Sequence, residues 1–444
     1  MRLFPYAPVT LLLCLCLPIA HARAPKPEPL PLEALQRFTV AIDHIRNYYV
    51  KPAEDEQLFE DAIRGMLTGL DPHSAYLDAE EFADLQVNTS GQFGGLGIEV
   101  TLEDHYIRVI TPIDDTPAQK GGIKAGDMII KINDTPVKGL SLRRAVEKMR
   151  GKPSTEVELT ILRPHTNQPL KMTLTREIIK VQSVRKKVME QHYGYLRISQ
   201  FQSHTANDLI DAIKALKKET SGQLKGIILD LRNNPGGVLE ASVKVSDAFL
   251  DKKKLTKNHL IVYTESRIPS SEIKEYATNG DILAGLPIVV LVNNGSASAS
   301  EIVAGALQDH QRALVLGTPT FGKGSVQTVL PLKDQRGLKL TTALYYTPLG
   351  RSIQATGILP DIEVENLLLT ASEHQEPSWV NLKERHLTGH LSNGSAEPNE
   401  VTLPPESAEE MEEESRPLVM RDYQLNEAFN LLRGLSLTRH IPAS

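Results

Sequence analysis

Three short, almost wholly apolar segments in the middle of the chain limit its fold more than any other feature. They read GIILDL, PIVVLV and RALVLG, and each runs into a turn rich in glycine, asparagine or proline. Amphipathic helical patterns accompany them, in HTANDLIDAIKALKKE and LEASVKVSDAFL. Buried strands that alternate with helices indicate βαβ units, whose strands pair in parallel. We therefore expect a mixed α/β fold, with parallel pairs in its sheet, over residues 179–370.

A second compact unit is expected before this one, over residues 90–178. Glycines cluster in SGQFGGLG, short strand-like runs follow, and SLRRAVEKMRG has the pattern of an amphipathic helix that ends at glycine. Residues 25–89 start with a proline-rich stretch and continue with two helical patterns, so we expect an N-terminal helical region there. It suggests a cap or an oligomer contact, and no chemical role.

The first 24 residues have the pattern of a secretory signal. Arg2 precedes an apolar run that is too short to span a bilayer comfortably, and Ala22 and Ala24 form an A-x-A cleavage pattern. An uncleaved anchor is the alternative. Lipoprotein processing fits less well, because neither Cys14 nor Cys16 follows the small residues such a site needs. We expect an exported, periplasmic protein without a stable membrane span.

Composition excludes several classes of function. Both cysteines lie in the signal segment, so the mature chain has no cysteine for a nucleophile, a disulfide framework or a zinc site. The net charge of −6 gives no general case for nucleic-acid binding. There is no HExxH motif and no pair of histidines at helical spacing beside a carboxylate. We predict neither a metal nor a cofactor.

The chain ends with an acidic linker and a helix. Residues 371–418 include SNGSAEPNEVTLPPESAEEMEEESRP, which is typical of a disordered segment. Residues 419–444 contain a pattern with Leu425, Phe429 and Leu432 on one helical face. A helix at the end of such a linker is expected to dock, either on its own core or on another subunit.

Candidate chemistry begins in NNGSASASEIVAGALQDH, where a strand ends and a helix begins. A serine at a helix N-terminus lies beside unpaired backbone N–H groups, which can stabilise an oxyanion. Spacing does not choose among Ser296, Ser298 and Ser300. The alternative to catalysis is a capping box, in which Ser298 and Glu301 only cap the helix. His310 follows Ser298 by twelve residues, roughly 18 Å along a helix, and is too far to act as its base.

Lys323 lies in GTPTFGKGSVQT, which resembles a phosphate-binding P-loop. The alternation of Val326, Thr328 and Leu330 predicts a strand after the lysine, whereas a P-loop lysine opens a helix. We therefore reject nucleotide binding. A lysine has an ordinary pKa of about 10.4, and burial can lower it by roughly 3–5 units. Such a lysine can act as a general base for a serine, although a surface turn is the usual position of a lysine.

A third segment, DLRNNPGG, brings backbone N–H groups to the carboxyl edge of the predicted sheet. Gly236 or Gly237 could supply a donor to an oxyanion. The alternative is a turn that needs the conformational freedom of glycine.

These stretches together resemble the carboxyl-terminal processing, or tail-specific, serine peptidases. GQFGGLGIEV, GGIKAGDMIIKIND, DLRNNPGG, NNGSASASEIVAGALQD and GTPTFGKGSVQT follow one another in the order of that family, over roughly residues 35–370. The resemblance implies a PDZ domain inserted before a protease core like those of crotonase and ClpP. It also implies an acyl-enzyme peptidase that recognises protein C-terminal regions.

The resemblance assigns a role to individual residues. Ser298 matches the nucleophile, Lys323 its general base, and Gln327 the residue that hydrogen-bonds the lysine. The N–H of Ala299 and a glycine, Gly236 or Gly237, match the oxyanion hole. Asp309 matches a supporting aspartate, and Arg176 resembles a residue implicated in gating by the PDZ domain. The peptide-binding nest comprises Leu96, Gly97 and Ile98.

Partners follow from the same resemblance. Protein C-terminal tails are the expected substrates, a homo-oligomer is expected, and a helical-repeat lipoprotein adaptor is a plausible partner. One alternative is a non-catalytic PDZ scaffold or chaperone-like protein. In such a protein the serine and the lysine would have been replaced, whereas both are present here. Another is a crotonase-type acyl-CoA hydratase, which would lack the PDZ unit and the signal.

Overall fold

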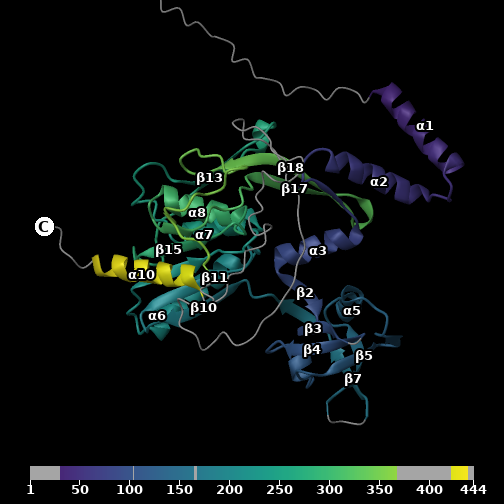
Figure 1. The fold of residues 1–444 in the computed structure, drawn as a ribbon, viewed down its shortest axis with the longest axis horizontal. Helices are drawn as coiled ribbons and strands as arrows, with labels where there is room; N and C mark the ends of the chain where they lie inside the picture. Colours follow the sequence, from purple (N-terminus) through teal and green to yellow (C-terminus); the bar gives the residue numbers. More distant parts are fainter. Residues whose placement is uncertain (1–30, 104, 165–167, 368–421, 439–444) are drawn as a thin grey trace, which may run out of the picture. The chain divides into compact units, whose positions relative to one another are not determined.

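The computed structural model describes residues 31–103, 105–164, 168–367 and 422–438 (Figure 1). The predicted signal segment and acidic linker lie outside these residues. The described residues up to 59 form one compact unit, and those from 60 onward form a second. In the first unit, α1 (Leu32–Tyr48) buries none of its side chains, and the start of α2 (Asp55–Thr68) follows. The rings of Phe38 and Phe59 lie 6.5 Å apart between centroids, and Arg46 pairs with Asp55 at 3.0 Å.

The centre of the second unit is a six-stranded sheet. Its strands lie in the order β10 (Val184–Met189), β11 (Tyr193–Ile198), β12 (Gly226–Asp230), β15 (Ile288–Val292), β16 (Leu314–Gly317) and β19 (Ile362–Glu363). All neighbouring pairs from β11 to β19 are parallel, and β10 is antiparallel to β11. The three apolar segments are β12, β15 and β16, so the predicted parallel sheet is confirmed.

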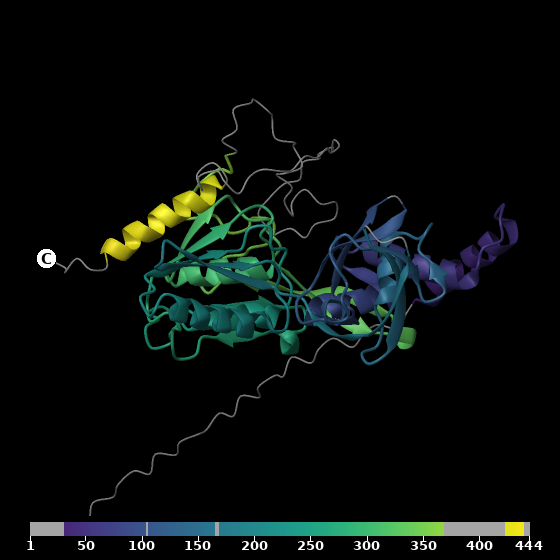
Figure 2. The same cartoon turned by 90° about the horizontal axis from the view of Figure 1, so that it is seen from below.

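Both faces of this sheet are covered, which explains why its strands are apolar throughout. Ile227 and Leu229 of β12 belong to the apolar cluster of α6 (Thr205–Glu219), α7 (Leu239–Asp247) and α8 (Ala299–Asp309). Ile228, between them, belongs to the cluster of the C-terminal helix α10 (Tyr423–Thr438). Figure 2 shows α10, in yellow, on the opposite side of the sheet from the teal helices. The C-terminal helix therefore docks on its own core.

A second, five-stranded sheet flanks this core. It contains β1 (Ala75–Leu77), β13 (Leu260–Glu265), β14 (Lys274–Tyr276), β17 (Ser325–Pro331) and β18 (Gly337–Tyr346). Short 3-10 turns lie at Pro269–Ser271 and Lys333–Gln335. β17 and β18 form a long antiparallel hairpin, and β1 and β13 pair with successive parts of β18. This arrangement brings residues near the start of the unit beside the strand that follows Lys323.

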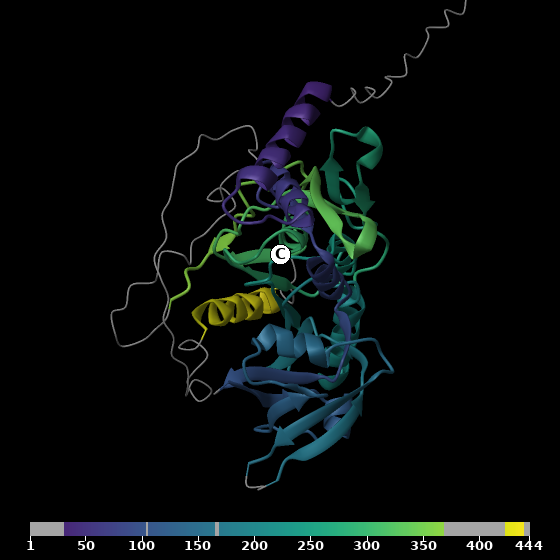
Figure 3. The same cartoon turned by 90° about the vertical axis from the view of Figure 1, so that its right-hand side faces the viewer.

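Residues between α3 (Ala79–Ser90) and β10 form the smaller domain, whose strands curve around its own apolar cluster (Figure 3). Its sheet contains β3 (Ile98–Glu103), β4 (Tyr106–Pro112), β5 (Met128–Ile132), β6 (Thr135–Pro136), β7 (Glu156–Leu162) and β8 (Leu170–Thr175). Its helices are α4 (Pro117–Lys120) and α5 (Leu142–Met149), and β2 (Gln92–Gly95) pairs with β9 (Glu177–Lys180). The helix α5 and the short strands match the sequence expectation.

Within the described ranges, no helix combines the length and the apolar character needed to cross a bilayer.

Candidate functional site

The turn between β15 and α8 contains the three serines among which the sequence pattern does not choose, and their surroundings differ. Ser296 and Ser300 are both 0% exposed. The Ser296 hydroxyl donates to the backbone oxygen of Leu231 at 2.8 Å, and that of Ser300 to the oxygen of Asn234 at 2.9 Å. Ser298 is instead partly exposed and lines a cavity of about 390 Å³. It is therefore the serine of this turn that a ligand in the cavity can reach.

Ser298 adopts a backbone conformation that side chains rarely take. Its φ is 55° and its ψ is −113°, immediately before the first residue of α8. Such a conformation costs on the order of 1–3 kcal/mol and persists only where the surroundings impose it. A sharp strand-to-helix turn exposes the serine side chain at the start of the helix, beside backbone N–H groups that have no partner within the helix.

Lys323 lines the same cavity as Ser298. Its Nζ donates to Gln327 Oε1 at 2.5 Å and to the backbone oxygen of Ser325 at 3.2 Å. Gln327 also lines the cavity. The strand β17 begins at Ser325, so the predicted strand after the lysine is confirmed and the helix of a P-loop is absent there.

The amide of Gln327 is oriented by a second set of hydrogen bonds. Its Nε2 donates to Ser325 Oγ at 3.0 Å and to Thr341 Oγ1 at 3.2 Å. The hydroxyl of Thr341, on β18, donates in turn to Asp71 Oδ1 at 3.0 Å. The direction of donation therefore runs from the Lys323 amine through Gln327 and Thr341 to a carboxylate.

Asp71 was missed by the sequence analysis. Its carboxylate is buried and accepts hydrogen bonds from the N–H of His73 at 2.8 Å, and from the N–H and hydroxyl of Ser74 at 2.9 and 2.6 Å. Burial raises the pKa of Asp71, but these hydrogen bonds outweigh it and hold the pKa below its ordinary value. An aspartate that accepts the N–H two residues ahead is typical of a turn, so Asp-Pro-His-Ser signalled a local structure but not its connection to β18.

Glu301 joins the serine turn to the lysine loop. Its fully buried carboxylate accepts the N–H groups of Ser298 at 2.7 Å, Gly322 at 2.7 Å and Lys323 at 2.9 Å, and the hydroxyl of Thr320 at 2.5 Å. Burial raises the pKa of Glu301 to about 7, although the four hydrogen bonds act in the opposite direction. The expected capping residue thus also holds the two halves of the site together.

The structure distinguishes the two glycines proposed for the oxyanion hole. The N–H of Gly236 donates to Asn234 Oδ1 at 2.9 Å. Gly237 lines the cavity, as does Ala299. The φ of Gly237 is 138°, and a Cβ there would lie 2.0 Å from the backbone oxygen of Phe201, so only glycine fits. The geometry therefore favours Gly237 over Gly236 as the partner of Ala299.

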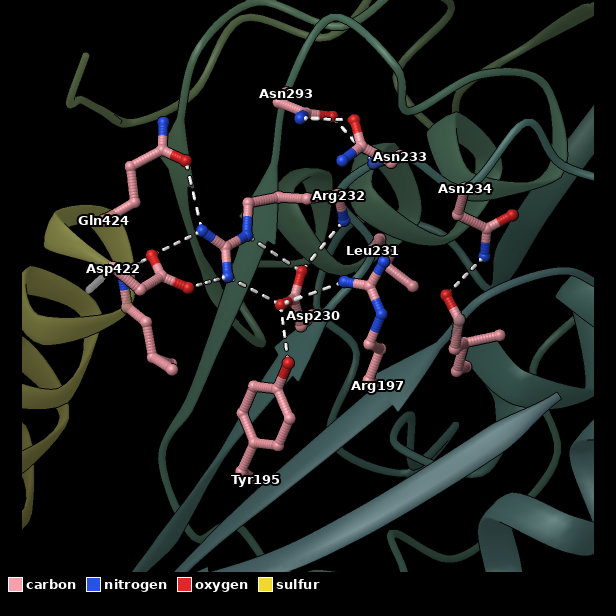
Figure 4. Close-up of polar contacts among 12 residues, drawn as sticks. Tyr195, Arg197, Asp230, Leu231, Arg232, Asn233, Asn234, Asn293, Asp422 and Gln424 are labelled. Carbon is pink, nitrogen blue, oxygen red and sulfur yellow. Dashed lines mark hydrogen bonds and ion pairs between the residues drawn. The ribbon is translucent and has the colours of Figure 1, made fainter. Parts of the chain in front are cut away.

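Asparagine side chains fasten this glycine loop to the serine turn. Asn293 Oδ1 accepts the N–H of Asn233, and Asn293 Nδ2 donates to Asn233 Oδ1, both at 2.8 Å (Figure 4). The N–H of Ala297 donates to the oxygen of Asn234 at 3.0 Å. Asn234 Nδ2 donates to the oxygen of Ile198 at 2.8 Å, which anchors the loop to the end of β11.

Asp309 lies at the opposite end of α8 from Ser298. It is buried, its Oδ2 accepts the N–H of Leu349 at 2.9 Å, and its Oδ1 pairs with Arg351 at 2.5 Å. These contacts hold the turn that follows β18, and the supporting role of Asp309 stays a prediction.

Arg176 is buried within the smaller domain. Its guanidinium donates to the backbone oxygens of Lys148 and Met149, both at 2.9 Å, and of Glu156 at 3.0 Å. A cation bonded to the last carbonyls of α5 stabilises the end of that helix. The gating role of Arg176 stays a prediction.

The predicted peptide-binding residues lead into the edge strand β3. Leu96 is buried, Gly97 has a φ of 74°, and Ile98 begins the strand. Partly buried apolar side chains of β3 and α5 pack on the core of the domain: Ile98, Val100, Leu142 and Val146. An edge strand beside a helix with apolar side chains is the geometry into which a peptide adds as a further strand.

Comparisons with protein families agree with these features. The sequence model of peptidase family S41 matches residues 192–364, that of the PDZ domain matches residues 84–162, and that of the N-terminal domain of the activating protease CtpB matches residues 19–81. The first range includes Ser298 and Lys323, and the second includes Leu96, Gly97 and Ile98.

Known carboxy-terminal processing proteases are similar to this chain over most of its length. A carboxy-terminal-processing protease of Bartonella bacilliformis is 48% identical over 407 residues, which cover 90% of this chain and 88% of that protein. The carboxy-terminal processing protease CtpA of Bacillus subtilis is 37% identical over 326 residues, 73% of this chain and 68% of that protein.

Among solved structures, the photosystem II D1 C-terminal processing protease aligns with 31% identity and a TM-score of 0.43, covering 76% of this chain and 88% of that one. The similarity to the Bartonella protein covers 90% of this chain. The chain therefore belongs to the carboxy-terminal processing proteases of peptidase family S41, and is a serine-type peptidase with a PDZ domain.

Proposed function

We propose that this protein is an exported endopeptidase that recognises the C-terminal regions of proteins through its PDZ domain and cleaves them with a Ser298–Lys323 dyad. The observation that carries the proposal is the common cavity. Ser298, Lys323, Gln327, Ala299 and Gly237 all line it, although they come from three separate loops.

The chemistry follows from the position of each group. The neutral amine of Lys323 takes the proton of the Ser298 hydroxyl as Oγ attacks the carbonyl carbon of the scissile peptide. The N–H groups of Ala299 and Gly237 stabilise the negative oxygen of the tetrahedral intermediate. The Lys323 ammonium then returns the proton to the departing amine, which leaves an acyl ester on Ser298. Water, deprotonated by the same lysine, hydrolyses the ester and regenerates the free serine.

Gln327 orients the base in this scheme. Its Oε1 accepts one hydrogen of the lysine Nζ at 2.5 Å. An amide oxygen holds the amine in place without a formal negative charge, which would favour the ammonium form. A carboxylate in the same position would oppose the role of a general base.

Substrate selection is assigned to the PDZ domain. The backbone N–H groups around Leu96, Gly97 and Ile98 would bind a terminal carboxylate, and the rest of the tail would add beside β3. Export to the periplasm, self-association and a helical-repeat lipoprotein adaptor remain parts of the proposal that rest on the sequence.

The decisive test uses three variants on an unfolded protein substrate. Ser298→Ala and Lys323→Ala are expected to lower kcat by at least about 10³-fold, because each removes a partner of the bond-making step. Lys333→Ala, on an exposed turn after β17, is the matched control and is expected to keep full activity. Proteolysis near the wild-type rate by Ser298→Ala would exclude the proposed nucleophile.

A further inference from the structure

An arginine beside the glycine loop holds the C-terminal helix. Arg232 donates through its two terminal nitrogens to the two carboxylate oxygens of Asp422, both at 2.7 Å (Figure 4). Asp422 immediately precedes α10, and its Oδ1 also accepts the N–H of Leu425 at 2.9 Å, which caps the helix. A paired, planar contact of this kind is geometrically specific.

Arg232 also pairs with Asp230, a buried carboxylate at the end of β12. Arg232 donates to Asp230 Oδ2 at 2.8 Å and, through Nε, to Oδ1 at 3.1 Å. Asp230 is 0% exposed and also receives the hydroxyl of Tyr195 at 2.8 Å and the guanidinium of Arg197 at 3.3 Å. Burial raises the pKa of Asp230, but the hydrogen bonds from Arg232 outweigh it and hold the pKa below its ordinary value.

The charges in this cluster sum to zero only when α10 is docked and Asp422 lies beside Arg232. Asp230 and Asp422 carry two negative charges, and Arg197 and Arg232 carry two positive charges, as Figure 4 shows. The side chain of Arg232 is only 11% exposed. Without the carboxylate of Asp422, Arg232 would keep Asp230 and the amide oxygen of Gln424, at 3.3 Å, but the cluster would carry one excess positive charge in a poorly hydrated position, which favours movement of the arginine.

Movement of Arg232 would be transmitted to the proposed oxyanion donor. Arg232 is joined by one peptide bond to Asn233, whose side chain and N–H both bond Asn293 of the serine loop. Asn234 follows and is bonded to Ile198, and Gly237, three residues further on, lines the cavity. A shift of about 1 Å in a catalytic group can cost on the order of a hundredfold in rate.

We propose that Asp422 is a positioning residue for catalysis: by pairing with Arg232 it holds the Asn233–Gly237 loop so that the N–H of Gly237 faces the oxyanion. The C-terminal helix then completes the catalytic machinery of its own chain. The inference rests on the proposed function, because it assigns Gly237 to the oxyanion hole.

The first test replaces Asp422 and measures peptide hydrolysis by the full chain. Asp422→Asn keeps the size of the side chain and removes its charge. Its kcat is expected to fall by about ten- to a hundredfold, with KM within about twofold of wild type, because the pocket for the substrate side chains is untouched. Asp422→Glu restores the charge and is expected to recover a large part of kcat.

A matched control comes from the same helix. Arg433 pairs with Glu190 at 3.7 Å, with both side chains about half exposed, and this pair also joins α10 to the sheet. Arg433→Gln removes a second ion pair between α10 and the core, longer and more exposed than that of Asp422, without touching the glycine loop, so wild-type kcat is expected. If Arg433→Gln and Asp422→Asn lower kcat equally, general docking of the helix and not Asp422 is responsible, and the proposal is overturned.

A transition-state mimic provides a second measurement. A peptide boronic acid forms a tetrahedral adduct with a serine, and one adduct oxygen occupies the oxyanion hole. Its affinity for Asp422→Asn is expected to fall by the same factor as kcat/KM, whereas a peptide that binds without a tetrahedral centre is expected to bind normally. Unchanged boronate affinity would overturn the positioning role.

The two proposals fail separately. Ser298→Ala tests the nucleophile in the same assay: activity in that variant would remove the proposed function. Loss of activity in Ser298→Ala together with wild-type kcat in Asp422→Asn would keep the peptidase mechanism and overturn the inference about Asp422.

Discussion

Glu301 is the residue at which local and long-range structure meet. Its position three residues after Ser298 is what a capping box requires, and its carboxylate does accept the N–H of Ser298. The same carboxylate also accepts two N–H groups from the loop that contains Lys323. The proposed nucleophile and the proposed base are therefore joined through one buried side chain.

The raised pKa of Glu301 predicts a pH dependence of stability. Burial raises it from an ordinary value of 4.5 to about 7, so the contribution of this group is complete below about pH 4.5 and is lost as the pH rises through 7. The free energy of unfolding of the wild type, relative to Glu301→Gln, is expected to fall by about 2 kcal/mol between pH 5 and pH 8. Denaturant unfolding of both proteins at the two pH values measures it. A difference independent of pH would contradict the titration of Glu301 in this range.

At the scale of elements, the β17–β18 hairpin connects Lys323, the proposed base, to residues near the start of the second unit. β17 carries Gln327, its partner β18 carries Thr341, and the turn before β1 carries Asp71. The pairing of the two strands aligns Lys323, Gln327, Thr341 and Asp71, so that each of the first three donates a hydrogen bond to the next. Chains of hydrogen bonds of this kind polarise one another in a poorly hydrated environment, so the orientation of Gln327 depends on a carboxylate two contacts away.

This relay predicts a contrast between two substitutions of Thr341. Thr341→Val keeps the shape of the side chain but removes the hydroxyl, so the Gln327 amide loses one of its two acceptors and its link to Asp71. The expected result is a fall in kcat of about tenfold with little change in KM, because the lysine and not the substrate is misplaced. Thr341→Ser keeps the hydroxyl and is expected to remain near wild type. Steady-state kinetics of both variants measure the contrast, and equal activity in the two would exclude a role for the hydroxyl.

At the scale of the whole molecule, the PDZ domain carries the residues proposed to bind a peptide tail, and the protease core carries Ser298 and its cavity. The edge strand β3, the turn at Gly97 and the apolar side chains of α5 are all built within the smaller domain. The loops proposed to be catalytic come from the core sheet and the β17–β18 hairpin. The proposed function therefore assigns selection and cleavage to separate elements, and it predicts that the two can be separated experimentally.

Amidation of a long substrate's C-terminus tests that separation. Loss of the terminal negative charge removes the group that the N–H groups at Gly97 would bind, so kcat/KM is expected to fall by about tenfold or more. A short peptide that occupies only the catalytic cavity is the control and is expected to be cleaved equally with a free or an amidated end. Equal cleavage of the two long substrates would remove the carboxylate as the signal for selection.

The sequence by itself determined the elements and the order of the catalytic loops, because burial of a strand or helix leaves a periodic pattern in neighbouring residues. The apolar runs predicted the parallel sheet, the alternation after Lys323 predicted β17, and the final helix pattern predicted α10. The tertiary structure decided what depends on partners distant in the chain. Ser298 was distinguished because Ser296 and Ser300 bond the glycine loop more than 60 residues away. Arg232 and Asp422, 190 residues apart, leave no local pattern, so their contact emerged only when α10 packed against the sheet.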